Sequence, residues 1–306
     1  TCSVTTQLGE VNVNAVKPGS KRWRGTVSSS KVPAILGLSP WKSPFALWHE
    51  MAGNVEPSQM DEQRAMIGHY AELMLVPYWL AQKPGWTCER TSELSYEQTF
   101  TDDYGYPAVA TVDAVAIGPD GEKCIVECKT TNDMSTWGQP GDPDAVPAHY
   151  YAQVMWQMGV SGIHRAQIIV EAFHEVEIHE IKWDEHQFAQ ILGRCLVWWK
   201  SLEAGTPPDL DDEPTTYDTV RGLHPDIDKG TTTDVDRTFA LALLDAHITT
   251  EEHKTVLQGL KTKALNLMGD TQHLMCEGEK IASRRAKAQG APFLVLNKDA
   301  RVGANQ

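Results

Sequence analysis

The chain has 306 residues, of which 41% are hydrophobic, which is enough for one large domain or for one domain with an appendage. No segment resembles a transmembrane run or a signal peptide, so we expect a cytoplasmic protein without membrane attachment. The formal net charge of −14 argues against tight nonspecific binding of nucleic acid over a broad surface, but it does not exclude contacts confined to a channel. The six cysteines lack CxxC spacing, so we expect reduced thiols and neither a zinc site nor an iron–sulfur cluster.

In chain order, residues 1–25 are polar without a helical or strand period, and we expect an extended arm. Residues 26–205 predict one α/β domain. We expect four helices in it. The first begins at Ser39-Pro40 or Ser43-Pro44, the second covers about 61–80, the third runs from Pro147 to near Gly159, and the fourth spans 185–203. Its expected strands lie in 108–131 and 165–183.

The remaining third of the chain has a different composition. Residues 206–236 are rich in Pro, Asp and Thr, which predicts a linker or loop. Apolar residues then return at helical spacing, so we expect a mainly helical extension over 237–306, with a helical hairpin or coiled segment over 245–269 and a strand over 293–296.

The stretch AVATVDAVAIGPDGEKCIVECKTT, residues 108–131, carries the clearest chemical pattern. Pro119-Asp120-Gly121 predicts a turn between two strands. If Gly118 and Glu122 flank this turn as a cross-strand pair, Asp113 falls opposite Glu127 and Thr111 opposite Lys129. Because side chains alternate along a strand, one face is then small and apolar (Ala110, Val112, Ala114, Ala116, Cys124, Val126 and Cys128), and the other presents Asp113, Glu127 and Lys129.

Two carboxylates in this position have Cβ atoms about 5 Å apart. They therefore repel each other unless a cation lies between them. A hard divalent ion with oxygen ligands fits, and Mg²⁺ is the usual choice. The neighbouring Lys129 could hold or deprotonate an attacking water. The alternative is an ordinary surface hairpin with a salt bridge between Glu127 and Lys129.

Three other segments add candidate residues. Glu72 lies one helical turn after Gly68, and a glycine there allows the helix to approach a sheet closely. Tyr150, Gln153 and Gln157 form one stripe of a helix. Hydroxyls and backbone amides at the helix starts between Ser28 and Pro44 could hold a phosphate. Taken singly, these features are also typical of solvated polar faces and helix caps.

In their order along the chain, the segments AILGLSPWKSPFALW, GHYAE, ATVDAVA, VECKT and HYYAQVMWQMGV resemble the YqaJ viral recombinase family, relatives of phage lambda exonuclease. The resemblance covers about residues 26–205. It implies a PD-(D/E)xK, restriction-endonuclease-like core, which is an α/β fold with a mixed central sheet flanked by helices, followed here by the helical extension. Most relatives carry proline before the metal-binding aspartate, where this chain has Val112. Because a mid-strand residue needs only strand geometry, we expect activity to survive.

The resemblance implies a Mg²⁺-dependent exonuclease that digests linear double-stranded DNA from 5′ to 3′ and leaves 3′ single-stranded tails for phage recombination. One or two ions are implied, with Mn²⁺ as a substitute. The implied partners are DNA ends, a single-strand annealing protein, and further copies of the chain in a ring such as a trimer, in the cytoplasm of a bacterial host.

By position, the family's metal site corresponds to Asp113, Glu127 and the backbone carbonyl of Cys128, and Lys129 corresponds to the residue that orients or activates water. Glu72 assists the metal shell, and Gln153 with Tyr150 positions the active-site end of their helix. The residues expected to bind DNA or its 5′-phosphate are Arg24, Ser30, Trp41 and Tyr150, although the spacing of Arg24 and Ser30 differs by one from that of the relatives.

Two other functions stay open. The chain could be another PD-(D/E)xK nuclease, either an endonuclease or a RecB-like enzyme, and cutting of closed circular DNA would favour the endonuclease. It could also be a catalytically inactive protein that binds DNA ends. The C-terminal extension is open to three roles: oligomerisation, docking of the annealing partner, or clamping of DNA.

Overall fold

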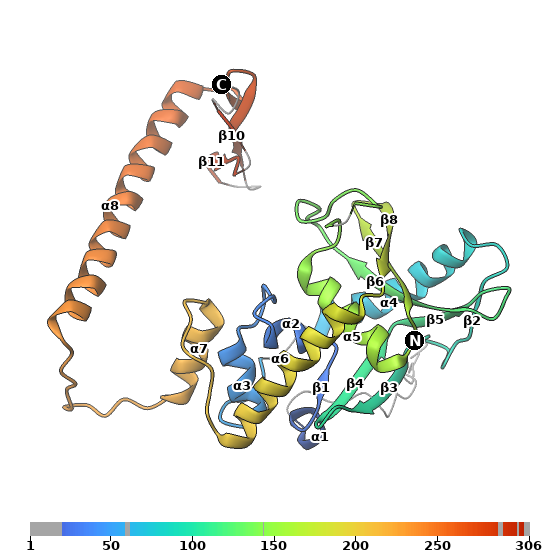
Figure 1. The fold of residues 1–306 in the computed structure, drawn as a ribbon. Helices are drawn as coiled ribbons and strands as arrows, with labels where there is room; N and C mark the ends of the chain where they lie inside the picture. The colour runs from blue at the N-terminus through green and yellow to red at the C-terminus, as the bar shows by residue number, and fades with distance from the viewer. Residues whose placement is uncertain (1–19, 59–61, 143, 287–289, 299, 303–306) are drawn as a thin grey trace, which may run out of the picture. The chain divides into compact units, whose positions relative to one another are not determined.

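The structure is a computed structural model that describes residues 20–58, 62–142, 144–286, 290–298 and 300–302 (Figure 1). The chain divides into two compact units, Thr1–Ile227 and Asp228–Gln306. Most of the expected arm, residues 1–19, lies outside the described residues. Residues Lys21–Arg24 of that arm form a short helix, α1, where an extended segment was expected.

The first unit is built on a five-stranded sheet in the order β2-β5-β6-β7-β8. Its strands are β2 (Thr87–Cys88), β5 (Ala114–Ile117), β6 (Lys123–Thr130), β7 (Arg165–Ala172) and β8 (Glu175–Lys182). The pair β6–β7 is parallel and the other pairs are antiparallel. A second sheet joins β1 (Val27–Ser28), β4 (Pro107–Val112) and β3 (Gln98–Asp103). The expected α/β class with a mixed central sheet and flanking helices is therefore confirmed.

The β5–β6 hairpin has the predicted register. Ala114 pairs with Val126, and the Gly118 amide donates to the Glu122 carbonyl at 2.8 Å. Gly121 closes the turn with a φ of 79°, which only glycine adopts without strain. The predicted pairing of Thr111 with Lys129 is wrong, because the strand breaks at Asp113 and Thr111 pairs with Thr99 in the other sheet.

The break at Asp113 also divides the apolar face into two cores. Side chains of β5 and β6 (Ala114, Ala116, Cys124, Val126 and Cys128) pack under α4 (Glu62–Ala81), as predicted. Ala110 and Val112, which we expected on the same face, instead lie in the second core with α5 (Ala148–Ser161) and α6 (Glu185–Ala204). The alternation of side chains restarts where the chain leaves one sheet for the other, so the residues on either side of the bend face different helices.

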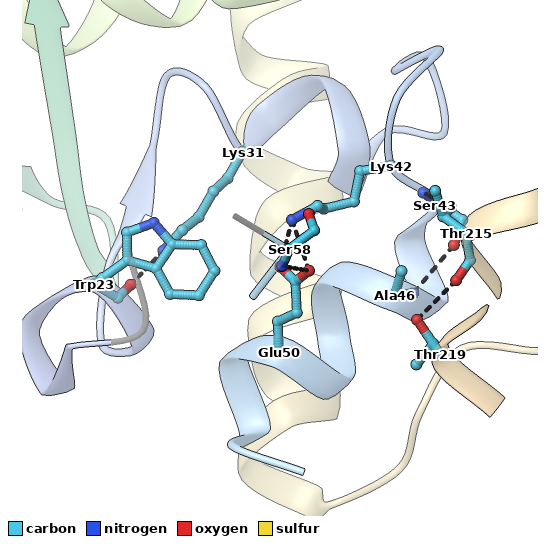
Figure 2. A network of polar contacts seen from close by, with 9 residues as sticks. All are labelled: Trp23, Lys31, Lys42, Ser43, Ala46, Glu50, Ser58, Thr215 and Thr219. Carbon is cyan, nitrogen blue, oxygen red and sulfur yellow. Dashed lines mark hydrogen bonds and ion pairs between the residues drawn. The ribbon is translucent and has the colours of Figure 1, made fainter. Parts of the chain in front are cut away.

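Helix caps fix the segments that surround these sheets. The short α2 (Val32–Ile35) precedes α3 (Pro44–Ala52), which begins where Ser43 Oγ accepts a hydrogen bond from the Ala46 amide at 3.1 Å (Figure 2). Ser43 Oγ also lies 2.6 Å from Thr216 Oγ of α7 (Pro214–Leu223). The segment 206–236 therefore differs from the expected linker, because it contains a helix that is anchored to α3.

The second unit contains one long helix and a small sheet. α8 (Arg237–Met268) is continuous, so the expected helical hairpin or coiled segment over 245–269 is a single helix. The strands β9 (His273–Cys276), β10 (Glu279–Arg285) and β11 (Phe293–Leu296) form an antiparallel sheet in the order β11-β10-β9. The strand over 293–296 was predicted, and the β9–β10 hairpin was not. Within the part of the chain that is described, no helix combines the length and the apolar character needed to cross a membrane.

Candidate active site

Asp113 and Glu127 meet at the edge where β5 begins. Continuing the β5–β6 register by one residue sets Asp113 against Glu127. The backbone amide of Cys128 donates a hydrogen bond of 2.7 Å to Asp113 Oδ2, which fixes the aspartate beside β6. The predicted opposition of the two acids is thus present, although Asp113 stands at a bend and not inside a strand.

Glu127 is only 1% exposed, and three donors surround its carboxylate. Oε1 accepts from Lys129 Nζ at 2.5 Å and from Gln153 Nε2 at 2.6 Å, and Oε2 accepts from Gln157 Nε2 at 2.8 Å. Both glutamines come from α5, so this helix sets the orientation of the carboxylate. Gln157 was placed in the polar stripe of α5 by sequence, but its contact with Glu127 was not expected.

The two acids and the lysine are electrostatically linked. Burial and the facing Glu127 hold the pKa of Asp113 well above its ordinary value, although Lys129 acts in the opposite direction. Burial alone would lower the pKa of Lys129, but Glu127 and Asp113 together raise it. The ammonium therefore stays protonated at neutral pH, whereas the charged form of Asp113 is disfavoured at this site in the absence of further positive charge.

Two further glutamates lie near this pair. Burial raises the pKa of both Glu72 and Glu97, and the charge of Glu127 contributes to each rise. Glu72 pairs with His69 of the same helix at 3.4 Å. Glu72 was a predicted site residue. Glu97 was not, because it directly precedes β3 and no motif spacing in the sequence connects it to the other acids.

An aromatic group formed by Tyr150, His149 and Trp41 lies beside Lys129. The Nζ atom of Lys129 is 5.2 Å from the centre of the Tyr150 ring. The Trp41 ring lies 4.9 Å from that of His149 and 6.1 Å from that of Tyr150. Trp41 is 62% exposed, so the group extends from the buried lysine to the surface.

Of the predicted phosphate-binding residues, Ser30 lies in a segment that adjoins the site, whereas Arg24 is paired with another residue. Ser30 is exposed, and its Oγ is 3.2 Å from Ser28 Oγ. The intervening Ser29 reaches the Thr111 carbonyl at 3.5 Å, and the same carbonyl accepts from Gln157 at 2.8 Å, so the serine segment adjoins the site. Arg24 instead forms an ion pair with Glu56 at 3.2 Å.

Few side chains at this site could serve as ligands of a divalent metal ion. Among the described residues, no group of three or more His, Cys, Asp and Glu side chains is arranged to hold a metal ion. Asp113 and Glu127 nevertheless supply two facing carboxylates whose repulsion a cation would relieve. The Cys128 carbonyl points to the same side of β6 as its amide, toward Asp113, because both groups of a strand residue face one neighbour. Three oxygen donors of this kind fit Mg²⁺, which usually retains several waters and binds few carboxylates.

Similar proteins and solved structures give this geometry a context. A protein of Bacillus subtilis (strain 168), the uncharacterized protein YqaJ, is 24% identical over 218 residues, and the match covers 68% of this chain and 64% of that protein. The chain thus spans less than two thirds of that relative's length.

Two solved structures are also similar. An alkaline exonuclease from Laribacter hongkongensis is 15% identical and covers 66% of this chain and 95% of its own, with a TM-score of 0.44. A putative exonuclease from Eubacterium rectale is 11% identical and covers 73% of this chain and 96% of its own, with a TM-score of 0.47.

The family comparison bears directly on the segment that contains the site. Residues 20–164 match the sequence profile of the YqaJ-like viral recombinase domain. This range includes Asp113, Glu127 and Lys129 together with Gln153 and Gln157 of α5. The resemblance seen in the sequence motifs is therefore confirmed for residues 20–164, which are similar to the YqaJ-like viral recombinase domain.

Proposed function

We propose that this chain is a Mg²⁺-dependent nuclease that digests linear double-stranded DNA from its 5′ ends and leaves 3′ single-stranded tails for homologous recombination. The observation that carries the proposal is the opposition of Asp113 and Glu127, with Lys129 bonded to Glu127 at 2.5 Å. Like-charged acids that are held together in this way are costly to the fold unless they serve a cation or a proton transfer. The direction of digestion rests on the family resemblance alone.

In this proposal Asp113, Glu127 and the Cys128 carbonyl hold one or two Mg²⁺ ions, for which Mn²⁺ substitutes. The bound metal supplies charge neutralisation at the scissile phosphate and lowers the pKa of a water. Glu72 and the newly found Glu97 lie at the edge of this set, where their carboxyl groups orient waters.

Lys129 acts as a hydrogen-bond donor and not as a base, because the neighbouring carboxylates raise its pKa. It holds the attacking water or a phosphate oxygen in line with the scissile bond. Gln153 and Gln157 are positioning residues that fix the Glu127 carboxylate from α5. Tyr150 lies against Lys129 and limits its motion.

The DNA end enters over the aromatic group. Trp41 offers an exposed π-face on which a terminal base stacks, and Ser30 offers a hydroxyl to the 5′-phosphate. Arg24 would have to leave Glu56 to join them. The proposal further includes a single-strand annealing protein as partner, a ring-shaped homo-oligomer such as a trimer, and action in the cytoplasm of a bacterial host.

A digestion time course tests the proposal. Linear duplex with a 5′-phosphate, the same duplex with a 5′-hydroxyl, and closed circular duplex are incubated in Mg²⁺ or in EDTA, with label on either end of one strand. We expect Mg²⁺-dependent release of nucleotides from the 5′ end of linear DNA, faster with the phosphate, and no cutting of the circle. Asp113→Ala should lose this activity and keep the circular dichroism spectrum of the wild type.

The other outcomes separate the alternatives. Cutting of the circle would identify an endonuclease. Binding of DNA ends without any cleavage would identify an inactive end-binding protein. An Asp113→Ala variant that digests linear duplex at the wild-type rate would rule out this site.

A further inference from the structure

α8 carries a row of large apolar side chains along one face. The C-terminal end of the helix contacts β9 and β11, where Met268 is buried, and Phe239 and Leu243 on the face opposite the row are also more than half exposed. On the helical projection of 100° per residue, the row falls within an arc of about 160°. The row consists of side chains that are each more than half exposed, namely Leu241, Leu244, Ile248, Val256, Leu260 and Leu267. So extended an apolar row on a helix of 32 residues is typical of a helix that packs against another helix.

Four of the six residues of the row are symmetric about Lys254, near the middle of the helix, whereas Leu244 and Val256 have Ala264 and Glu252 as their counterparts. Leu241 and Leu267 lie at equal distances from Lys254, and so do Ile248 and Leu260. Two charged residues obey the same symmetry, because Asp245 and Lys263 are 18 residues apart, which is about five helical turns. Both charges therefore fall within the arc of the apolar row, one in each half of the helix.

The charges of α8 are also divided between its halves. Residues 237–252 contain three acidic side chains and one basic side chain, a net charge of −2. Residues 253–268 contain Lys254, Lys261 and Lys263 and no acid, a net charge of +3. A parallel pair of such helices would bring like charges together, whereas an antiparallel pair brings the acidic half of one helix to the basic half of the other.

We propose that α8 pairs two copies of this chain in an antiparallel, two-fold symmetric contact along its apolar row. In the register that the symmetry selects, Leu241 meets the second copy's Leu267 and Ile248 meets its Leu260. Asp245 meets Lys263 twice, once on each side of the two-fold axis. A polar pair within an apolar seam fixes register and orientation, because any shift leaves both charges without a partner.

Charge reversal in the full-length chain tests the contact by sedimentation equilibrium. We expect the wild-type mass to be an even multiple of the chain mass, which is six chains if α8 joins two of the proposed trimers. Asp245→Lys or Lys263→Asp alone should raise the dissociation constant by about tenfold or more, since like charges then face each other in the seam. The double reversal Asp245→Lys with Lys263→Asp should restore association. Val197→Asp, at an exposed apolar position on α6, is the control and should leave the mass unchanged.

Disulfide trapping determines the orientation. Chains with Asp245→Cys and chains with Lys263→Cys, in a Cys276→Ser background and with different tags, are mixed and oxidised. Antiparallel pairing gives a disulfide between the two tags, and parallel pairing gives Asp245→Cys homodimers instead. A monomeric wild type, a double reversal that does not restore association, or trapping only within one tag would overturn the proposal. These measurements read mass and cross-linking, so their outcome is independent of nuclease activity.

Discussion

Gln157 and Glu127 are joined by a hydrogen bond of 2.8 Å between two buried side chains, one on α5 and one on β6. The same Nε2 atom donates to the Thr111 carbonyl at 2.8 Å, at the end of β4. One amide group therefore links the helix, the central sheet and the neighbouring sheet at the point where the chain bends. Its Oε1 atom is buried and has no hydrogen-bond partner in the described structure.

Replacing Gln157 by leucine should impair catalysis while keeping the volume of the buried side chain. Residues that orient a metal ligand typically contribute 10–100-fold to metal affinity or activity, so we expect the rate on linear duplex to fall by roughly that factor. Gln190→Leu, on the exposed face of α6, should have no effect. Equal rates of the two variants over a Mg²⁺ titration would show that Gln157 does not position Glu127.

Local patterns predicted the centre of the site. The Pro119-Asp120-Gly121 turn sets the register of β5 and β6, and that register alone determines that Asp113 opposes Glu127. The apolar face under α4 follows from the same alternation. A turn motif and the alternation of side chains along a strand each involve only a few neighbouring residues. They can therefore be recognised without knowledge of the rest of the fold.

The parts that sequence did not predict depend on distant contacts. The bend at Asp113 occurs because β4 pairs with β3 and β1 instead of extending the central sheet, and no residue near Asp113 encodes that choice. Glu97 reaches the acids only through this second sheet. Helix α7 was missed because the side chains that it buries, Thr216 and Thr219, are polar, and because its contact with Ser43 joins segments about 170 residues apart in the sequence.

Removal of the metal should destabilise the wild type more than an Asp113→Asn variant. The asparagine keeps an acceptor for the Cys128 amide and removes the charge that burial and Glu127 disfavour. In EDTA we therefore expect Asp113→Asn to melt at a higher temperature than the wild type. Mg²⁺ at about 100 times its dissociation constant should stabilise the wild type by ~2.7 kcal/mol and the variant by much less.

Differential scanning calorimetry with and without Mg²⁺ measures both effects. Asp120→Asn, in the exposed hairpin turn, serves as the matched control and should respond to Mg²⁺ as the wild type does. An equal response of Asp113→Asn and wild type to Mg²⁺ would place the metal elsewhere.

Trp41→Ala should weaken the binding of DNA ends more than it slows the chemical step. The ring is 62% exposed beside His149 and Tyr150, and stacking of a base on an aromatic side chain contributes about 1–3 kcal/mol. We expect KM for linear duplex to rise roughly tenfold with a smaller change in kcat, and Trp41→Phe to recover most of the loss. Tyr217→Ala, an exposed aromatic residue on α7, should leave KM unchanged, and an equal KM for Trp41→Ala would remove Trp41 from the DNA path.

Lys31 gives the fold a dependence on pH that is separate from catalysis. Its ammonium donates to the carbonyl of Trp23 (Figure 2) and to that of Thr26. It lies 3.9 Å from the centre of the Trp23 ring. Burial lowers its pKa from 10.5 to about 7, with Glu50 opposing the shift and Lys42 adding to it. Between these two values the unfolded chain holds a proton that the folded chain has released. The free energy of unfolding should therefore rise with pH across this window, by up to about 1.4 kcal/mol per pH unit.

Urea unfolding of wild type and Lys31→Met at about pH 7 and about pH 9, in EDTA, isolates this contribution. Methionine keeps the buried apolar stem and removes the titrating group, so the wild type should gain stability relative to the variant as the pH rises. Lys200→Met, on the exposed side of α6, should follow the wild type at both pH values. If Lys31→Met and wild type change in parallel, Lys31 keeps its proton in the folded chain, and its two carbonyl acceptors outweigh the cost of burial.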